Sequence, residues 1–106
     1  MKRHFFFILL SLAERERHGL DMMRDVLELT GGELKLWPAT LYGSLDELVE
    51  DGLIEELSAA GERPSGASER KRFYRITAAG RRALVQETHR IEALVDVVRL
   101  RLHEAK

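Results

Sequence analysis

Apolar positions recur along the chain at helical spacing, beginning at its first residues. The run from Phe5 to Leu10, extended by Leu12, is apolar on every side and predicts a first helix that must be covered all round. Residues 20–30 predict a second helix, which Gly31 and Gly32 end as a C-terminal cap. The apolar positions of this second helix are Met22, Met23, Val26, Leu27 and Leu29.

The middle of the chain predicts a third helix after a very short extended segment. Residues 33–37, ELKLW, alternate apolar and polar side chains over only a few positions. Pro38 suits the first turn of a helix, because its missing amide hydrogen costs no hydrogen bond there. From residue 38 to residue 51 the apolar positions step by three and four, which predicts a helix with one inward face. That face consists of Leu41, Leu45, Leu48 and Val49.

Two short segments flank a polar loop and predict a β-hairpin. LIEEL, residues 53–57, follows the turn signal Asp51-Gly52 and predicts a strand. RKRFYRI, residues 70–76, alternates well enough for a second strand. The sequence between them, SAAGERPSGAS at residues 58–68, is small, polar and typical of a loop.

A long last helix is predicted from residue 78 nearly to the end, with Thr77 as its N-cap. Its apolar residues step by four and three, as in the seam of a coiled coil. They are Leu84, Ile91, Val95, Val98 and Leu102, with Thr88 in the one gap. The fold predicted is therefore mainly α with a small β-hairpin. It is a winged helix-turn-helix over residues 1–76 and a C-terminal dimerisation helix over residues 77–106, in one compact domain.

Composition and motifs give no sign of an enzyme. The chain has 106 residues and no cysteine, which leaves room for a modest core and excludes disulfides and thiol chemistry. No serine lies in the sequence context of a nucleophile elbow, and Gly31-Gly32 lacks the rest of a phosphate loop. His89, Glu92 and Asp96 could share one helix face, but such three- and four-residue steps occur on the polar face of any charged helix. We expect no catalytic activity, no metal and no cofactor.

The first residues imitate a secretory signal, with Lys2 and Arg3 before the apolar run and Ala13 after it. Cleavage there would remove the first helix of a pattern that is otherwise complete, so we expect this segment to belong to the folded protein. A membrane-spanning helix needs about 20 consecutive apolar residues, and this run is shorter. We expect a cytoplasmic protein without membrane contact; a small exported protein is the alternative.

Three segments of the chain resemble the PadR family of bacterial transcriptional regulators: residues 8–23, 29–56 and 70–84. PATLYGSL, with DGLIE following, is the most specific part. The resemblance, to the compact subgroup, implies a dimeric DNA-binding repressor, often released by a small effector. It places the third helix in the major groove, the hairpin as wing and the last helix at the dimer interface. This sequence departs from the family pattern at Leu20, Trp37, Asp46 and Glu47.

The distribution of charge gives this expectation mixed support. Residues 62–75 carry five basic and two acidic side chains, a net charge of +3, whereas residues 38–51 carry four acids and no base. A recognition helix presents its N-terminal turn to DNA, and the acids lie beyond that turn. The expected contacts to double-stranded DNA come from Lys35, Pro38, Ala39, Thr40, Tyr42, Gly43, Arg63, Arg70, Lys71 and Arg72.

Three side chains have alternative interpretations. Tyr42 either faces DNA, which we favour, or is a half-buried packing residue. Trp37 is expected as a core or shelf residue more than as a base contact or an effector platform. His18 is expected to cap the second helix or to contact a phosphate.

The unmatched apolar surfaces predict a homodimer. Both the first helix and the seam of the last helix are covered if two chains associate. The interface residues expected are Phe5, Phe6, Leu9, Leu84, Ile91, Leu94, Val95, Val98 and Leu102. A small-molecule effector wedged at this interface would release DNA by changing the separation of the two half-site readers. The competing function is a winged-helix protein-interaction module whose acidic third helix contacts a protein in place of DNA.

Overall fold

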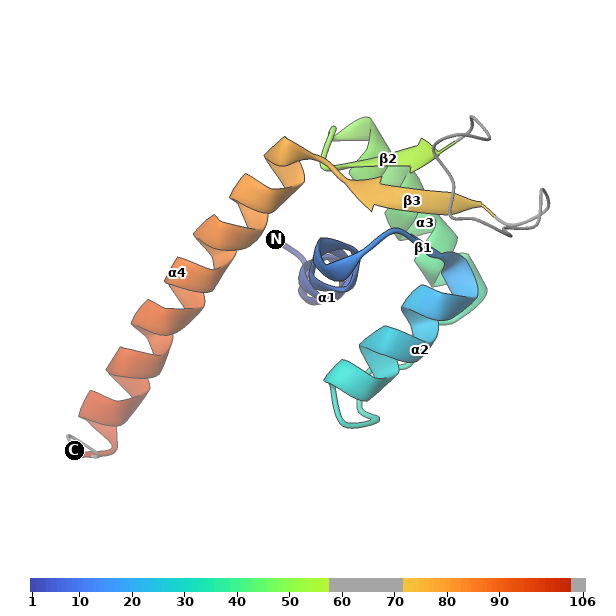
Figure 1. The fold of residues 1–106 in the computed structure, drawn as a ribbon. Coiled ribbons are helices and arrows are strands. Elements are labelled where there is room, and N and C mark those ends of the chain that lie inside the picture. Colours follow the sequence, from blue (N-terminus) through green and yellow to red (C-terminus); the bar gives the residue numbers. More distant parts are fainter. Residues whose placement is uncertain (58–71, 104–106) are drawn as a thin grey trace.

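The computed structural model describes residues 1–57 and 72–103. Helices α1 (Arg3–Glu14), α2 (Gly19–Leu29) and α3 (Pro38–Glu50) precede the strands β2 (Ile54–Leu57) and β3 (Phe73–Ile76). Helix α4 (Ala78–Arg101) ends the described chain, and a two-residue strand, β1 (Arg17–His18), lies between α1 and α2. Figure 1 shows α4 extending away from the other elements, and the longest dimension of the molecule is 54 Å.

Local sequence signals set the helix ends as predicted. The His18 side chain accepts a hydrogen bond from the Asp21 amide at 3.4 Å, so it caps α2. Gly31 and Gly32 have φ angles of 62° and 89°, and their amides donate back to the carbonyls of Glu28 and Leu27. This left-handed turn ends α2 and satisfies its last carbonyl groups. Thr77 Oγ1 accepts from the Gly80 amide at 3.0 Å and starts α4.

The sheet has one strand more than the predicted hairpin. The strand order is β1-β3-β2, and both pairings are antiparallel. Residue Arg17 is opposite Tyr74, and Ile54 is opposite Ile76. The charged stretch before α2, which gave no strand signal, supplies β1. Residues 33–37 belong to no strand, so the alternation of ELKLW marks only a connection between α2 and α3.

The burial of Arg17 explains why the sequence did not predict β1. Only 3% of this residue is exposed, although arginine is ordinarily a surface residue. Its guanidinium pairs with Glu14 and, at 2.9 Å, with Asp21, and its Nε donates to the Ser11 carbonyl oxygen at 2.9 Å. These partners compensate the burial of the charge. Arg17 thereby joins α1, β1 and α2 through a polar network inside the domain.

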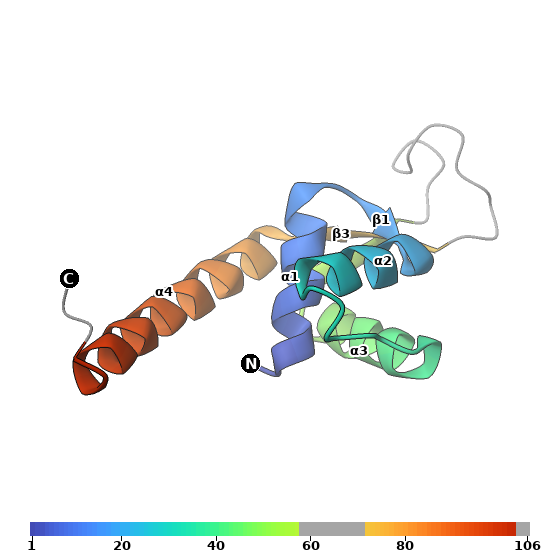
Figure 2. The same ribbon diagram turned by 90° about the horizontal axis from the view of Figure 1, so that it is seen from below.

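Helix α1 is the centre of the hydrophobic core. It lies between α4 on one side and α2 and α3 on the other (Figure 2), which explains its apolar surface on all sides. Ile8, Leu9 and Leu12 belong to one buried cluster with residues of α2, α3, β2 and β3, and Leu84 of α4 packs against it. The remaining buried members of this core are Phe5, Met22, Val26, Leu36, Leu41, Leu45, Leu48, Ile54, Tyr74 and Ile76.

Burial in this core corrects the predicted dimer interface. Leu9 has no exposed surface and Phe5 is only 8% exposed, because their own chain already covers them. Leu9 therefore has no surface to offer a second chain. Phe6 is half-buried, and Leu84 packs against the core while keeping part of its surface accessible.

Candidate nucleic-acid interface

The first turn of α3 presents small and hydroxyl-bearing residues to solvent. Pro38, Ala39, Thr40 and Gly43 are exposed, whereas Leu41 faces the core. No acidic side chain lies in this turn. The first amides of a helix have no intrahelical partner, and the helix dipole makes this end positive. The turn therefore offers free donors and a positive potential at a surface that a phosphate backbone can approach closely.

Tyr42 is half-buried and packs against the start of α2. A methyl group built on Gly19 would lie 2.3 Å from the Tyr42 hydroxyl oxygen and 3.3 Å from Leu41. Only glycine leaves room for this contact, so the HG pair at residues 18–19 is explained by packing against α3. The Tyr42 ring also lies 5.5 Å from the guanidinium carbon of Arg72. Tyr42 thus contacts the start of α2 and the residue that precedes β3.

Arg72, which directly precedes β3, makes contacts within its own chain. Its guanidinium lies 3.0 Å from the Glu56 carboxylate on β2 and 3.7 Å from the Asp46 carboxylate on α3. It also lies over the Tyr74 ring at 5.6 Å. Hydrogen bonding to Glu56 raises the pKa of the Arg72 guanidinium. Arg72 therefore connects the wing strands to the helix expected to read DNA.

Two of the acids on α3 are paired with basic side chains. Asp46 pairs with Arg72, and Glu47 accepts a hydrogen bond from the Lys2 ammonium at 3.4 Å. These side chains are exposed, so each pair contributes little to stability. Their importance is electrostatic, because they offset negative charge on the helix beyond its first turn.

Tyr74 carries a buried hydroxyl beneath Arg72. The residue is fully buried, and its hydroxyl has no hydrogen-bond partner among the residues that the structure describes. Burial, against the opposing effect of Arg72, raises the pKa of Tyr74 to about 12. The side chain is therefore neutral at physiological pH and acts as a packing residue of the sheet.

Trp37, which was expected in the core or on a shelf, lies on the surface and not in the core. It is 62% exposed, whereas its neighbour Leu36 is 4% exposed and fills the core position. The Lys35 ammonium lies 4.5 Å from the centroid of the Trp37 ring, a cation–π geometry. Lys35 and Trp37 thus form an exposed shelf directly before α3.

The other predicted wing contacts, Arg63, Arg70 and Lys71, lie outside the described residues. The described parts of the wing are its two strands. Strand β2 ends at Leu57, and strand β3 begins at Phe73. The first turn of α3, Tyr42 and Arg72 are thus the predicted DNA-contacting groups that the described structure brings together.

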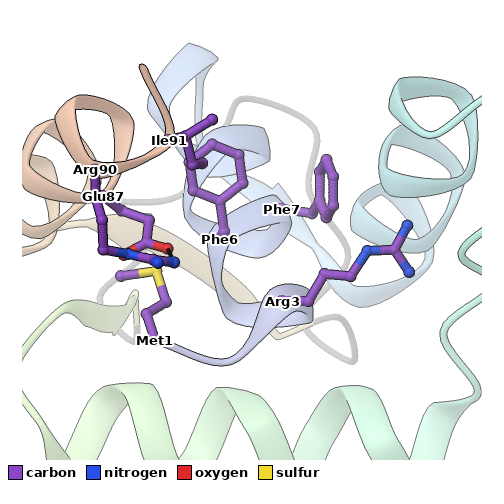
Figure 3. Close-up of a pocket in the computed structure, with 7 residues that line it drawn as sticks. All are labelled: Met1, Arg3, Phe6, Phe7, Glu87, Arg90 and Ile91. Atoms are coloured by element: carbon purple, nitrogen blue, oxygen red, sulfur yellow. Dashed lines mark hydrogen bonds and ion pairs between the residues drawn. The ribbon is translucent and has the colours of Figure 1, made fainter. Parts of the chain in front are cut away.

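The outer surface of α4 is apolar and uncovered. Ile91, Leu94, Val95, Val98 and Leu102 are between 36% and 62% exposed. A groove of about 320 Å³ runs between α4 and α1 (Figure 3). It is lined by Met1, Arg3, Phe6, Phe7, Glu87, Arg90 and Ile91, and Glu87 pairs with Arg90 on its wall. This surface includes Phe6, Ile91, Leu94, Val95, Val98 and Leu102 of the predicted interface, but not Phe5, Leu9 or Leu84, which pack in or against the core.

Within residues 1–57 and 72–103, no three His, Cys, Asp or Glu side chains are grouped to hold a metal ion. None of the helices described there is long and apolar enough to cross a membrane.

Sequence reasoning missed two features of this region. One is the contact between Arg72 and Asp46, which are distant in the chain and carry no motif. The other is a second apolar face of α2, formed by Leu20, Met23 and Leu27. The signal for that face was present, because Met22 and Val26 already account for the inward side of the helix.

Three helices, a small antiparallel sheet with a wing hairpin and an exposed third-helix N-terminus define a winged-helix protein. The sequence pattern described as "Transcriptional regulator PadR-like family" matches residues 8–86. The chain therefore belongs to the PadR-like family of transcriptional regulators.

Solved structures have the same fold. A PadR family regulator from Clostridium difficile R20291 has a TM-score of 0.76 at 22% identity, over 92% of this chain and 96% of that one. A transcriptional regulator from Clostridium thermocellum has a TM-score of 0.73 at 23% identity, over 89% of this chain and 84% of that one. Bacillus subtilis PadR in complex with operator DNA gives 0.67 at 22% identity, over 82% of this chain and 47% of that one. This chain thus spans about half the length of the Bacillus protein, and no curated protein sequence matches it.

Proposed function

We propose that this protein is a homodimeric, sequence-specific DNA-binding repressor. The observation that carries the proposal is the exposed, acid-free first turn of α3 beside the wing strands. Helix N-termini attract phosphate through free amides and the helix dipole. In this proposal Ala39, Thr40 and Gly43 approach the major groove, with Lys35 and Pro38 at its edge. Tyr42, although half-buried, contacts the DNA phosphate backbone through its hydroxyl.

The wing supplies the phosphate contacts through Arg63, Arg70 and Lys71. Arg72 has a different role, because two carboxylates of its own chain already hold its guanidinium. It positions α3 against the wing and neutralises Asp46 near the DNA. A protein that neutralises four to six phosphates per dimer would show a log affinity against log salt slope of about −4 to −5.

The dimer is formed by the apolar face of α4, with residues 1–76 reading DNA and residues 77–106 holding the two chains together. Exposed apolar side chains along α4 support this assignment, since contiguous apolar surface marks association sites. A twofold dimer would read a pseudo-palindrome with half-sites about 34 Å apart or a multiple of it. An effector at this interface would act by altering that separation.

Selection of bound sequences from pooled random duplexes tests the proposal. We expect enrichment of a palindromic site and a steep loss of affinity with salt. A dimeric protein that enriches no sequence at low salt would contradict it. The acidic second half of α3 would then favour the alternative, a winged-helix module that contacts a protein.

A further inference from the structure

A second groove lies between α2 and the residues that lead into α3. Its volume is about 290 Å³, at the low end for small-molecule sites. Its lining consists of Leu20, Met23, Arg24, Leu27, Lys35, Leu36, Trp37 and Pro38. Nothing in the proposed DNA contacts or in the dimer interface on α4 accounts for its apolar floor.

The floor is the second apolar face of α2. Leu20, Met23 and Leu27 follow one another at three- and four-residue steps and so lie on one side of the helix. The core side of the helix is formed by Met22 and Val26, which are fully buried, and Met23 at its edge packs partly against the core as well. Leu20 is 48% exposed and Trp37 is 62% exposed, so this face is open to solvent.

The rim of the groove is positively charged. Arg24 and Lys35 are both exposed, and none of the described residues that line the groove is acidic. In the described part of the chain neither side chain takes part in an ion pair, and Lys35 lies over the Trp37 ring. The groove therefore combines an apolar floor with two cations available to an anionic group.

We propose that this groove binds a small amphipathic anion, a medium-chain carboxylate. The apolar tail lies on Leu20, Met23 and Leu27, and the carboxylate lies between Arg24 and Lys35. A DNA strand is a poorer complement, because a phosphodiester backbone needs donors along its length and this floor offers none. Carboxylates form their stronger hydrogen bonds with such cationic donors.

Binding in this groove would compete with DNA, a consequence that rests on the proposed function. Lys35 and Pro38 line the groove and also flank the first turn of α3. A carboxylate that occupies Lys35 removes one positive charge from the surface facing DNA. The ligand would therefore lower the affinity for an operator without contacting the dimer interface.

The test is an NMR titration of the DNA-free dimer with octanoate, with 1-octanol as the neutral control. Trp37 is the only tryptophan, so its indole N–H resonance reports on the groove, together with the assigned Met23 methyl resonance. We expect both resonances to shift and saturate with octanoate, and octanol to bind at least about fivefold more weakly. Fivefold corresponds to about 1 kcal/mol, the upper value for one exposed charge pair, and here two cations face one carboxylate.

Two double variants decide the role of the charges. Arg24→Gln/Lys35→Gln should weaken octanoate binding at least about fivefold and leave octanol binding unchanged. The matched control, Arg82→Gln/Arg99→Gln, removes two exposed cations of α4 and should change neither. Equal binding of octanoate and octanol, no saturating shift at Trp37, or shifts confined to α4 would each overturn the proposal. Because this titration contains no DNA, its outcome is independent of whether the protein binds an operator.

Discussion

The guanidinium of Arg72 lies 3.7 Å from the carboxylate of Asp46. This ion pair joins the residue before β3 to the middle of α3. The strand belongs to the predicted wing and α3 is the predicted recognition helix, so both are expected to face DNA. Glu56 holds the same guanidinium from β2 at 3.0 Å. Arg72 therefore links β2 and α3 within one chain, through exposed pairs that each contribute little to stability.

Arg72→Gln should weaken operator binding about three- to tenfold, because Asp46 is left unneutralised and α3 loses its connection to the wing. The slope of log affinity against log salt should stay within about 0.5 of the original, since no phosphate contact is removed. Titrations at several salt concentrations measure both quantities. A slope less steep by about one per subunit would show that Arg72 contacts phosphate directly.

Gly19→Ala should destabilise the protein by about 1 to 3 kcal/mol, because the new methyl group would lie 2.3 Å from the Tyr42 hydroxyl oxygen. Denaturant unfolding measures the change. Combining it with Tyr42→Phe should recover part of the loss by removing that oxygen, with Tyr42→Phe alone as the control. A Gly19→Ala protein as stable as the original would show that Tyr42 does not hold α2 and α3 in this arrangement.

Tyr74 should make the protein lose stability between about pH 10 and pH 12. Its pKa is about 12 in the folded chain, against 10.0 for the unperturbed side chain. The unfolded state therefore releases the proton first, so unfolding becomes more favourable as pH rises through this window. The difference in unfolding free energy between the original protein and Tyr74→Phe, followed from pH 8 to pH 11, should shift in favour of the variant. A constant difference would contradict the burial of the hydroxyl.

Val98→Glu should convert the proposed dimer into monomers, because it places a charge in the apolar face of α4, where Val98 is 53% exposed in the single chain. Sedimentation measures the mass. Gln86→Glu, at another exposed position of α4, adds the same charge and should leave the dimer intact. If Val98→Glu also remained dimeric, the interface would have to lie elsewhere.

Local patterns in the sequence predicted most of the fold. Pro38, Thr77 and the Gly31-Gly32 cap mark helix ends through short-range hydrogen bonding, and apolar spacing marks inward faces, so these elements lie where expected. The strand β1 could not be predicted, because its buried Arg17 depends on acids supplied by α1 and α2. A two-residue strand also carries no periodicity of its own.

The apolar pattern did not show which apolar side chains the chain's own core covers and which stay exposed. Leu9 and Phe5 belong to the same run as Phe6, but neighbours on several elements cover the first two. Trp37 was expected in the core or on a shelf, and the apolar pattern did not decide between the two; Leu36 fills the core position and Trp37 is exposed. The pairing of Asp46 with Arg72 depends on the packing of α3 against the sheet, which local sequence does not encode.

The most direct test of DNA binding by α3 is the operator affinity of Ala39→Glu. Ala39 is exposed in the first turn of α3, where an added acid favours the helix but repels phosphate. We expect operator affinity to fall about a hundredfold with no loss of folding stability, whereas Gln86→Glu binds normally. Unchanged affinity in Ala39→Glu would contradict the claim that this turn docks on DNA.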